Sequence, residues 1–401
     1  MSTSTLDSEP ACPGDDGSAP LPTGDRVLRA EQRAFDRIPA ETWDRLARRN
    51  PWATPFSEWA FHRAWWDAYA ANAHEQTVVV VDDAAGPDAD PIAIVPLMHR
   101  HEVETSDALT RTTMRHGAGI ELTPVEPTAK AIFFGASYHA DYATILADPA
   151  DLPAVAAAFV ELLAAEPPPD EAHPTAWDVV DLRRLRCGDP AADALAAAFG
   201  AREIAEGWRL NVEREDVCPV TTVPPGTTFE AFLGTLGKKE RHEIRRKLRR
   251  AEAAGELKLE DSADPLADLE AFIDLHQKRW GERGLFPDTA GGEQSRVFFR
   301  RLFELGAVDG PVRLMFLSVA GRRIAAAIQL EARDGRLYYY AGVDPDARDL
   351  SPGVVMTAKL VERAIAEGCR RFDFLRGNEP YKYEWGATDE PIQRLLVRRR
   401  V

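Results

Sequence analysis

The segment 337–385 constrains the fold most, because it sets a strand, a capped helix, a second strand and a charged stretch in one order. The aromatic run 337–343 is predicted to be a strand, and Ser351-Pro352-Gly353 opens the helical run 354–367. Serine at the N-cap accepts a backbone N–H and proline sets the first turn, so this helix start is well specified. A strand, a loop and a helix N-terminus together favour anion binding, because free N–H groups and the positive dipole end face the loop. A capped helix without a ligand is the alternative.

The composition indicates a reduced, intracellular setting. With 401 residues, of which 45% are hydrophobic, the chain can bury more than one core, and we expect two domains. The net charge of -16 disfavours general binding to DNA or to a membrane surface. The four cysteines form no Cys-x-x-Cys pair, which indicates neither a zinc site nor a disulfide framework. Residues 1–25 lack the apolar core of a signal peptide, so we expect a disordered leader and a cytoplasmic protein without membrane insertion.

Hydrophobic periodicity and turn residues predict two halves with a similar order of elements. The first half is predicted to contain helices at 42–49, 55–71 and 152–165 and strands at 77–81, 92–98, 141–147 and 177–182. The second is predicted to contain strands at 312–319, 324–332, 337–343 and 372–375 and the helix 354–367. We therefore expect an α/β fold of two tandem domains, at 26–214 and 215–401, each with a mixed, mostly antiparallel sheet flanked by helices.

A basic helix is predicted at 238–253. Ile244, Leu248 and Ala251 follow one another at spacings of four and three and form a narrow apolar stripe. Six basic side chains cover the other faces, namely Arg241, Arg245, Arg246, Lys247, Arg249 and Arg250. A solvated face is one interpretation. The other is a docking strip for a phosphate-bearing partner such as a nucleotide tail or an RNA backbone.

The polar residues after the last predicted helix are the candidates for catalysis. The chain has no P-loop, no Gly-x-Gly-x-x-Gly and no His-Glu-x-x-His motif, and its histidines show no metal-like spacing beyond His99-x-His101. Direct acyl transfer needs a carboxylate that receives the nucleophile's proton, a donor for the oxyanion and an acid for the leaving group. Asp373 or Glu379, Lys382 and Tyr381 are the residues that fit these roles. A hydrogen-bonded strand end with surface charges is the alternative.

Several motifs taken together resemble a known family. They are Lys238-Lys239-x-Arg241 with the run 245–249, Leu275-His276 with Arg279-Trp280, the run 372–377 with Tyr381-Lys382, and Gly135-Ala136-x-Tyr138 with Asp141-Tyr142. From about residue 55 onward the chain resembles the GNAT superfamily of acyltransferases, in particular the bacterial branch of cellulose-biosynthesis-like proteins, which is related to the Fem aminoacyltransferases with tandem GNAT-like domains.

This resemblance implies acyl-CoA, acetyl-CoA first, as co-substrate and no metal. The donor cleft would lie between the strands 337–343 and 372–375, with backbone amides near Ala341 and Gly342 polarising the thioester carbonyl. Residues near the coenzyme would be Ala341, Gly342, Arg348, Ser351 and Gly353. Residues near the acceptor, a small molecule or a saccharide precursor, would be Asp141, Tyr142, Arg279, Trp280 and Arg376.

The chain departs from the family in the pyrophosphate loop. The segment 348–353 keeps an arginine and one glycine, and Pro352 has no N–H to donate. Three interpretations follow: an acyl-CoA-dependent N- or O-acyltransferase, a Fem-like transferase that uses aminoacyl-tRNA and the basic helix, and a non-catalytic binding module with a GNAT fold. The acidic total charge disfavours tRNA, whereas the cluster of ionisable groups at 373–382 favours an enzyme.

Overall fold

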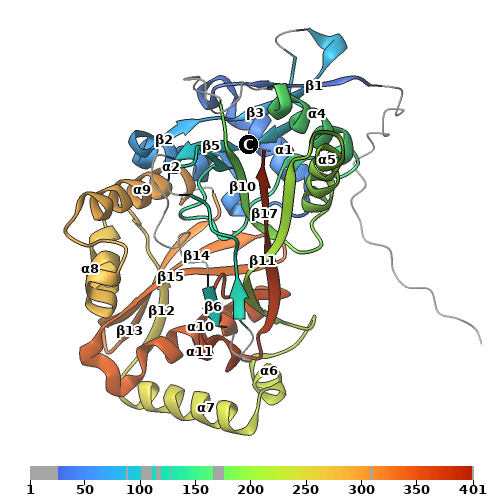
Figure 1. Ribbon diagram of the computed structural model, residues 1–401. Helices are drawn as coiled ribbons and strands as arrows, with labels where there is room; N and C mark the ends of the chain where they lie inside the picture. The colour runs from blue at the N-terminus through green and yellow to red at the C-terminus, as the bar shows by residue number, and fades with distance from the viewer. Residues whose placement is uncertain are drawn as a thin grey trace, which may run out of the picture.

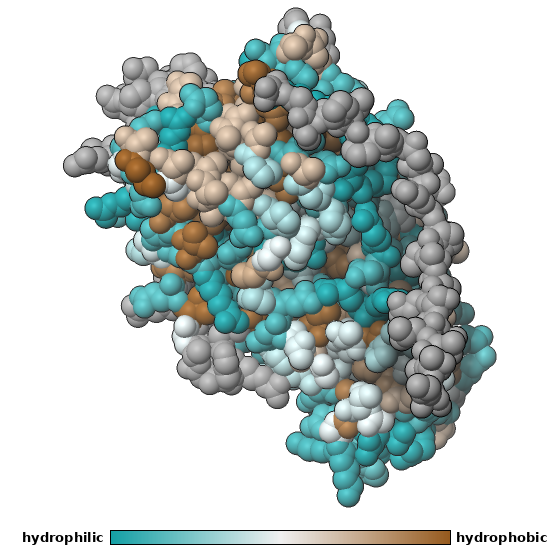
Figure 2. Space-filling view, turned by 90° about the vertical axis from the view of Figure 1, so that its right-hand side faces the viewer, coloured by the Kyte–Doolittle hydropathy of each residue, from teal (hydrophilic) through white to brown (hydrophobic). Residues whose placement is uncertain are grey.

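The computed structural model describes residues 26–86, 89–100, 111–113, 119–126, 128–165, 176–307 and 310–399. The leader expected at 1–25 lies outside these ranges. Figure 1 shows an upper lobe of blue and green segments above a lower lobe of yellow to red segments. In Figure 2, which views the right-hand side of Figure 1, hydrophilic residues surround scattered apolar ones.

The upper lobe is built from the first half of the chain. Its elements are β1 (Leu28–Gln32), α1 (Ala40–Arg49), α2 (Trp59–Tyr69), β2 (Ala73–Glu75), β3 (Val78–Asp82), β4 (Ala93–Val95), β5 (Leu97–Arg100), β6 (Arg111–Thr113), β7 (Gly119–Glu121), β8 (Ala131–Phe134), β9 (Leu146–Ala147), α4 (Leu152–Ala165), β10 (Val179–Arg186), α5 (Pro190–Glu206) and β11 (Arg209–Thr222). The predicted strand 92–98 is two strands, because Pro96 interrupts it, and β4 and β5 join different sheets.

The lower lobe follows the predicted order closely. Its elements are α6 (Phe229–Thr235), α7 (Lys238–Ala253), β12 (Leu257–Asp261), α8 (Leu269–Trp280), α9 (Ala290–Gly306), β13 (Val312–Val319), β14 (Arg322–Ala332), β15 (Gly335–Val343), the 3₁₀ helix η6 (Pro345–Leu350), α10 (Pro352–Ala366), β16 (Arg371–Asp373), α11 (Pro380–Tyr383) and β17 (Thr388–Arg398). The hairpin expected around Gly321 is present, and the basic helix is α7.

One sheet of eleven strands runs through both lobes in the order β12-β13-β14-β15-β16-β11-β17-β10-β8-β5-β2. β17 pairs antiparallel with β11 on one side and with β10 on the other. Figure 1 shows β11 and β17 passing from one lobe into the other. β11 therefore spans the boundary expected at 214/215.

The α/β class with sheets flanked by helices is confirmed.

The lobes also share an aromatic core on one face of the sheet. α2 packs against α9, and the rings of Phe61 and Phe298 lie 5.4 Å apart between centroids. The ring of Phe56 lies 5.3 Å from that of Tyr339 on β15. The opposite face of β15 is covered by α10, which in turn contacts α7. Burial of these large rings fixes the upper lobe against the strands that carry the candidate site.

Candidate functional site

A cavity opens where β15 and β16 separate. The two strands pair in parallel only from Gly335↔Arg371 to Leu337↔Asp373. Beyond this point β15 continues to Val343, while the chain after β16 turns into α11. The resulting strand-end cavity has a volume of about 370 Å³ and is lined by Arg279, Trp280, Tyr338, Ala341, Gly342, Val343, Gly353, Val354, Thr357, Glu379, Tyr381, Glu384 and Trp385.

The β15 wall of this cavity carries a β-bulge. In the pairing of β14 with β15, Ile328 lies opposite Tyr340 but Gln329 lies opposite Tyr338, so Tyr339 is an extra residue. Such a bulge locally changes where backbone groups and side chains point. It stands just before Ala341 and Gly342, the two positions whose amides were expected to face a thioester.

Seven of the predicted site residues line the strand-end cavity. These are Ala341, Gly342, Gly353, Arg279, Trp280, Glu379 and Tyr381. Trp280 and Tyr381 are 43% and 45% exposed, unusually high values for large aromatic residues. Four further lining residues were not among the predicted site residues: Tyr338, Thr357, Glu384 and Trp385. The position of Trp385 at the end of the charged segment was the one signal in the sequence that could have indicated it.

Gly342 is required by helix packing. A Cβ atom at this position would lie 2.4 Å from the backbone nitrogen of His276 and 2.5 Å from the carbonyl carbon of Leu275. The absent side chain therefore lets α8 lie against β15, which brings Trp280 to the cavity. At Gly353, by contrast, an added Cβ would meet Val343 at an ordinary 3.9 Å.

Lys382 holds the turn after β16. Its side chain is buried, and Nζ donates to the carbonyl oxygens of Leu375, Arg376 and Gly377 at 2.9, 2.7 and 3.0 Å. Nζ also lies 2.9 Å from Oε2 of Glu379. Four oxygen partners around one ammonium group fix the turn and place the Glu379 carboxylate at the cavity rim. The predicted catalytic lysine thus lies beneath the cavity and does not line it.

The phenol of Tyr381 is held in its protonated form. Desolvation raises its pKa well above the ordinary value, and Tyr338 and Glu379 raise it further, although the residue as a whole is 45% exposed. A tyrosine that stays protonated at neutral pH can donate a proton to a leaving group. Its ring packs edge-on against Phe374, with 6.1 Å between centroids.

The N-terminus of α10 differs in detail from the prediction. Ser351 is at the N-cap, but it adopts φ of 54° and its side chain caps no backbone N–H; its hydroxyl accepts from Arg250 at 2.7 Å. The N–H groups of Val354 and Val355 both donate to the Ser351 carbonyl, each at 3.1 Å. Pro352 has no N–H, so the helix end offers few free donors, and the Arg250 guanidinium lies beside it.

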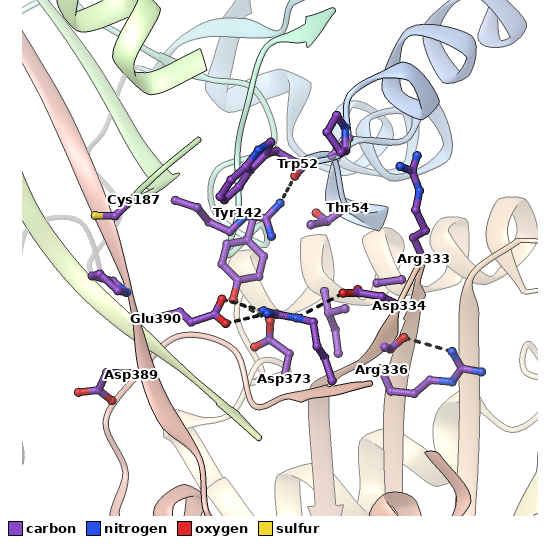
Figure 3. A pocket seen from close by; sticks show the side chains of 18 residues that line it. Trp52, Thr54, Tyr142, Cys187, Arg333, Asp334, Arg336, Asp373, Asp389 and Glu390 are labelled. Atoms are coloured by element: carbon purple, nitrogen blue, oxygen red, sulfur yellow. Dashed lines mark hydrogen bonds and ion pairs between the residues drawn. The ribbon is translucent and has the colours of Figure 1, made fainter. Parts of the chain in front are cut away.

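Asp373 and Tyr142 lie in a second cavity, the interlobe cavity. The Tyr142 hydroxyl donates to Oδ2 of Asp373 at 2.7 Å, and Oδ1 accepts from the Leu375 amide at 2.8 Å. Burial raises the pKa of Asp373 from 3.8 to about 6, against the lowering effect of these two hydrogen bonds. Figure 3 shows both residues in this cavity. The four predicted catalytic residues are therefore not brought together: two line the strand-end cavity, Lys382 lies beneath it, and Asp373 lines the other cavity.

Asp141 and Arg376 join the two lobes. Arg376 Nε lies 3.2 Å from Oδ1 of Asp141, and its backbone N–H points at Oδ2. Both side chains are about one-fifth exposed, at 19% and 21%. Of the remaining predicted residues, Arg348 belongs to η6 and lines neither cavity.

The structure offers no metal centre within its described ranges, where no group of three or more His, Cys, Asp or Glu residues is placed to hold an ion. In the same ranges no helix is long and apolar enough to cross a membrane.

Comparisons with known proteins agree with this arrangement. The family described as "Acetyltransferase (GNAT) domain" matches residues 238–383, from the start of α7 to the end of α11. No curated protein matches the chain. The solved structure of FemX is similar, with 12% identity, a TM-score of 0.55 and coverage of 90% of this chain and 96% of FemX. A conserved protein of unknown function from Bacteroides thetaiotaomicron has 12% identity and a TM-score of 0.50, covering 91% and 98%.

The segment 238–383, which the model of the GNAT acetyltransferase domain matches, holds both walls of the strand-end cavity, and this match supports an acyltransferase. At 12% identity, the two structural likenesses show a shared fold and no more.

Proposed function

We propose that the protein transfers an acyl group from acyl-CoA to an amine or hydroxyl of a small molecule or saccharide precursor. The observation that carries this proposal is the strand-end cavity, which opens between separating strands of a GNAT domain and is lined mainly by apolar groups. Such a cavity fits an acyl group and the thiol-bearing arm of coenzyme A. The relationship to the cellulose-biosynthesis-like branch is part of this proposal and comes from the sequence motifs.

The residues at the rim supply the proton transfers. As the acceptor nitrogen or oxygen attacks the thioester carbonyl, the new C–N or C–O bond forms, the C–S bond breaks, and the acceptor loses a proton. Glu379 receives that proton in this proposal, and the Tyr381 phenol protonates the departing thiolate. Lys382 positions Glu379 through the 2.9 Å contact and does not itself touch the reacting atoms.

Arginine side chains would hold the phosphates of the donor. The α10 end has Pro352 at its first position, and the amides of Val354 and Val355 both donate to the Ser351 carbonyl, so few N–H groups are free. Arg250 reaches Ser351 at this helix end, Arg348 follows on η6, and Arg279 lines the cavity. A guanidinium group binds phosphate in bidentate geometry, which compensates for missing backbone donors.

Titration calorimetry and a transfer assay with the full-length protein test the proposal. Acetyl-CoA, longer acyl-CoAs and free coenzyme A should each bind saturably. Tyr381→Phe should lower kcat about 100-fold while leaving the affinity for acetyl-CoA nearly unchanged. Tyr383→Phe is the matched control, since Tyr383 lies outside the cavity lining and its hydroxyl donates to Asp389. If no coenzyme binds at millimolar concentration, the proposal is wrong.

A Fem-like transfer from aminoacyl-tRNA is the second candidate, and α7 is the observation that favours it. Six of its basic side chains form no ion pair with the described part of the chain: Lys238, Lys239, Arg241, Lys247, Arg249 and Arg250. Of these, Arg241 donates to the Gly234 carbonyl and Arg250 to the Ser351 hydroxyl. Unpaired cations along one helix suit a nucleic-acid backbone. By contrast, Arg245 and Arg246 are paired with Glu230 and Glu243. A binding module without catalysis is the third candidate, and loss of turnover with retained coenzyme binding would favour it.

A further inference from the structure

The interlobe cavity is a second concave site that acyl transfer in the strand-end cavity does not use. Its volume is about 530 Å³, and its wall comes from both lobes: the loop 51–54, Tyr142 and the end of β10 above, and the β14–β15 turn, β16 and the start of β17 below. Figure 3 shows Trp52, Thr54 and Arg333 on one side of the cavity and Asp373, Glu390 and Asp389 on the other. The two cavities share no lining residue. A volume in this range is typical of a small-molecule site.

Four arginines line this cavity, and they differ in their partners. Arg371 forms a bidentate pair with Glu390 at 2.7 Å for both bonds, and Arg336 pairs with Glu367 at 2.8 Å. Arg186 and Arg333 form no ion pair with the described residues: each donates only to a backbone carbonyl, that of Trp52 and that of Arg48 respectively. Neither guanidinium group is therefore engaged in a direct ion pair, although Arg186 is close enough to the Asp189 carboxylate to interact with it electrostatically.

Arg186 is also held in place. Its guanidinium carbon lies 4.8 Å from the Trp52 ring centroid and 5.0 Å from the Tyr142 ring centroid. Two aromatic contacts and the hydrogen bond to the Trp52 carbonyl restrain the plane of the guanidinium group. An arginine fixed before binding loses little conformational freedom when it forms a bidentate pair with an anion.

We propose that the interlobe cavity binds a small molecule through an anionic group, a phosphate or a carboxylate, held by Arg186 with Arg333 at the rim. The exposed Arg333 and the half-buried Arg186 belong to different lobes, so the ligand bridges the β14–β15 turn and the end of β10. The site stands whether or not the strand-end cavity takes acyl-CoA.

Calorimetric titration of the full-length protein with inorganic phosphate, and separately with succinate, tests this site. At least one probe should bind saturably at millimolar concentration, and the stronger probe identifies the anionic group. Arg186→Gln should weaken that binding about tenfold or more, because a charge-assisted bidentate pair is lost, and Arg333→Gln about threefold. Arg209→Gln is the matched control: it removes another arginine without an ion pair, outside the cavity, and should change nothing.

Two further measurements distinguish binding at this site from binding at the coenzyme site, and a direct effect of the substitution from misfolding of the variant. Saturating free coenzyme A should leave phosphate affinity unchanged, whereas displacement of phosphate by the coenzyme would overturn the proposal. So would the absence of saturable binding for both probes, or equal weakening in Arg186→Gln and Arg209→Gln. If Arg186→Gln does not fold, Arg186→Lys replaces it: this variant keeps the positive charge without the bidentate geometry and should give an intermediate affinity. Because Arg333 is exposed, Arg333→Gln tests the site independently of whether the Arg186 variants fold.

Discussion

Asp373→Asn should stabilise the protein at neutral and alkaline pH. Burial raises the pKa of this carboxyl from 3.8 to about 6, so the folded state favours the protonated form. At about 1.36 kcal/mol per pKa unit, a shift of roughly 2 units lowers the free energy of unfolding of the native protein by about 3 kcal/mol once the carboxyl is ionised. Asparagine has nearly the same shape and remains neutral, so it avoids this penalty.

The sign of the effect sets its pH dependence. Below pH 3.8 Asp373 is protonated in both states, and the two proteins should be equally stable. The advantage of Asp373→Asn should grow between pH 3.8 and about 6 and then reach its plateau. Urea unfolding at pH 4, 5, 6, 7 and 8 measures it. Asp90→Asn, at a side chain that is 79% exposed, is the control and should differ from the native protein by no more than about 0.5 kcal/mol. A difference that is independent of pH, or a loss of stability at pH 8, would refute the reasoning.

Three further predictions follow from the site. Lys382→Met removes four charge-assisted contacts from a buried turn and should lower the free energy of unfolding, measured in urea titrations, by about 3 kcal/mol. A loss of less than about 1 kcal/mol would show that the turn is stable without the lysine. Gly342→Ala forces α8 away from β15 and should cost about 2 kcal/mol or more, whereas Gly353→Ala, with its nearest contact at 3.9 Å, should be tolerated; equal thermal shifts would contradict this. Lys247→Glu with Arg249→Glu should leave acyl-CoA transfer unchanged but abolish any tRNA-dependent transfer, because it reverses two unpaired charges on α7; tRNA-dependent transfer that survives both changes would show that α7 does not bind the tRNA.

The sequence predicted those helices and turns that depend on residues close together in the chain, such as runs of high helix propensity and positions of glycine and proline. α4 lies at the expected residues because a long Ala- and Leu-rich run has high helix propensity between polar breaks. The hairpin at Gly321 and the start of α10 at Pro352 follow from glycine and proline backbone preferences. Five of the seven predicted cavity residues lie within 341–381, in and around the two predicted strands, whereas Arg279 and Trp280 were indicated only by the family resemblance.

Distant pairing was not predictable in the same way. Nothing in 388–398 alone shows that this strand would pair with both β10 and β11. Lys382 stands in an aromatic and charged segment that suggests a surface, yet the carbonyls of the preceding turn enclose its ammonium group. Tyr142 and Asp373 meet across 231 residues of chain. The pairing of β17 and the contact of Tyr142 with Asp373 depend on how the lobes pack, whereas the contacts of Lys382 depend on the conformation of a single turn.

The place of β17 has a consequence for the order in which the molecule can be assembled. It follows every other strand of the described residues in sequence, but it lies inside the sheet, between β10 of the upper lobe and β11. During synthesis both of these strands must wait with unpaired backbone groups until residues 388–398 have been made. Neither lobe can therefore complete its sheet first, and cutting at 215 would divide β11 rather than release a unit that folds alone.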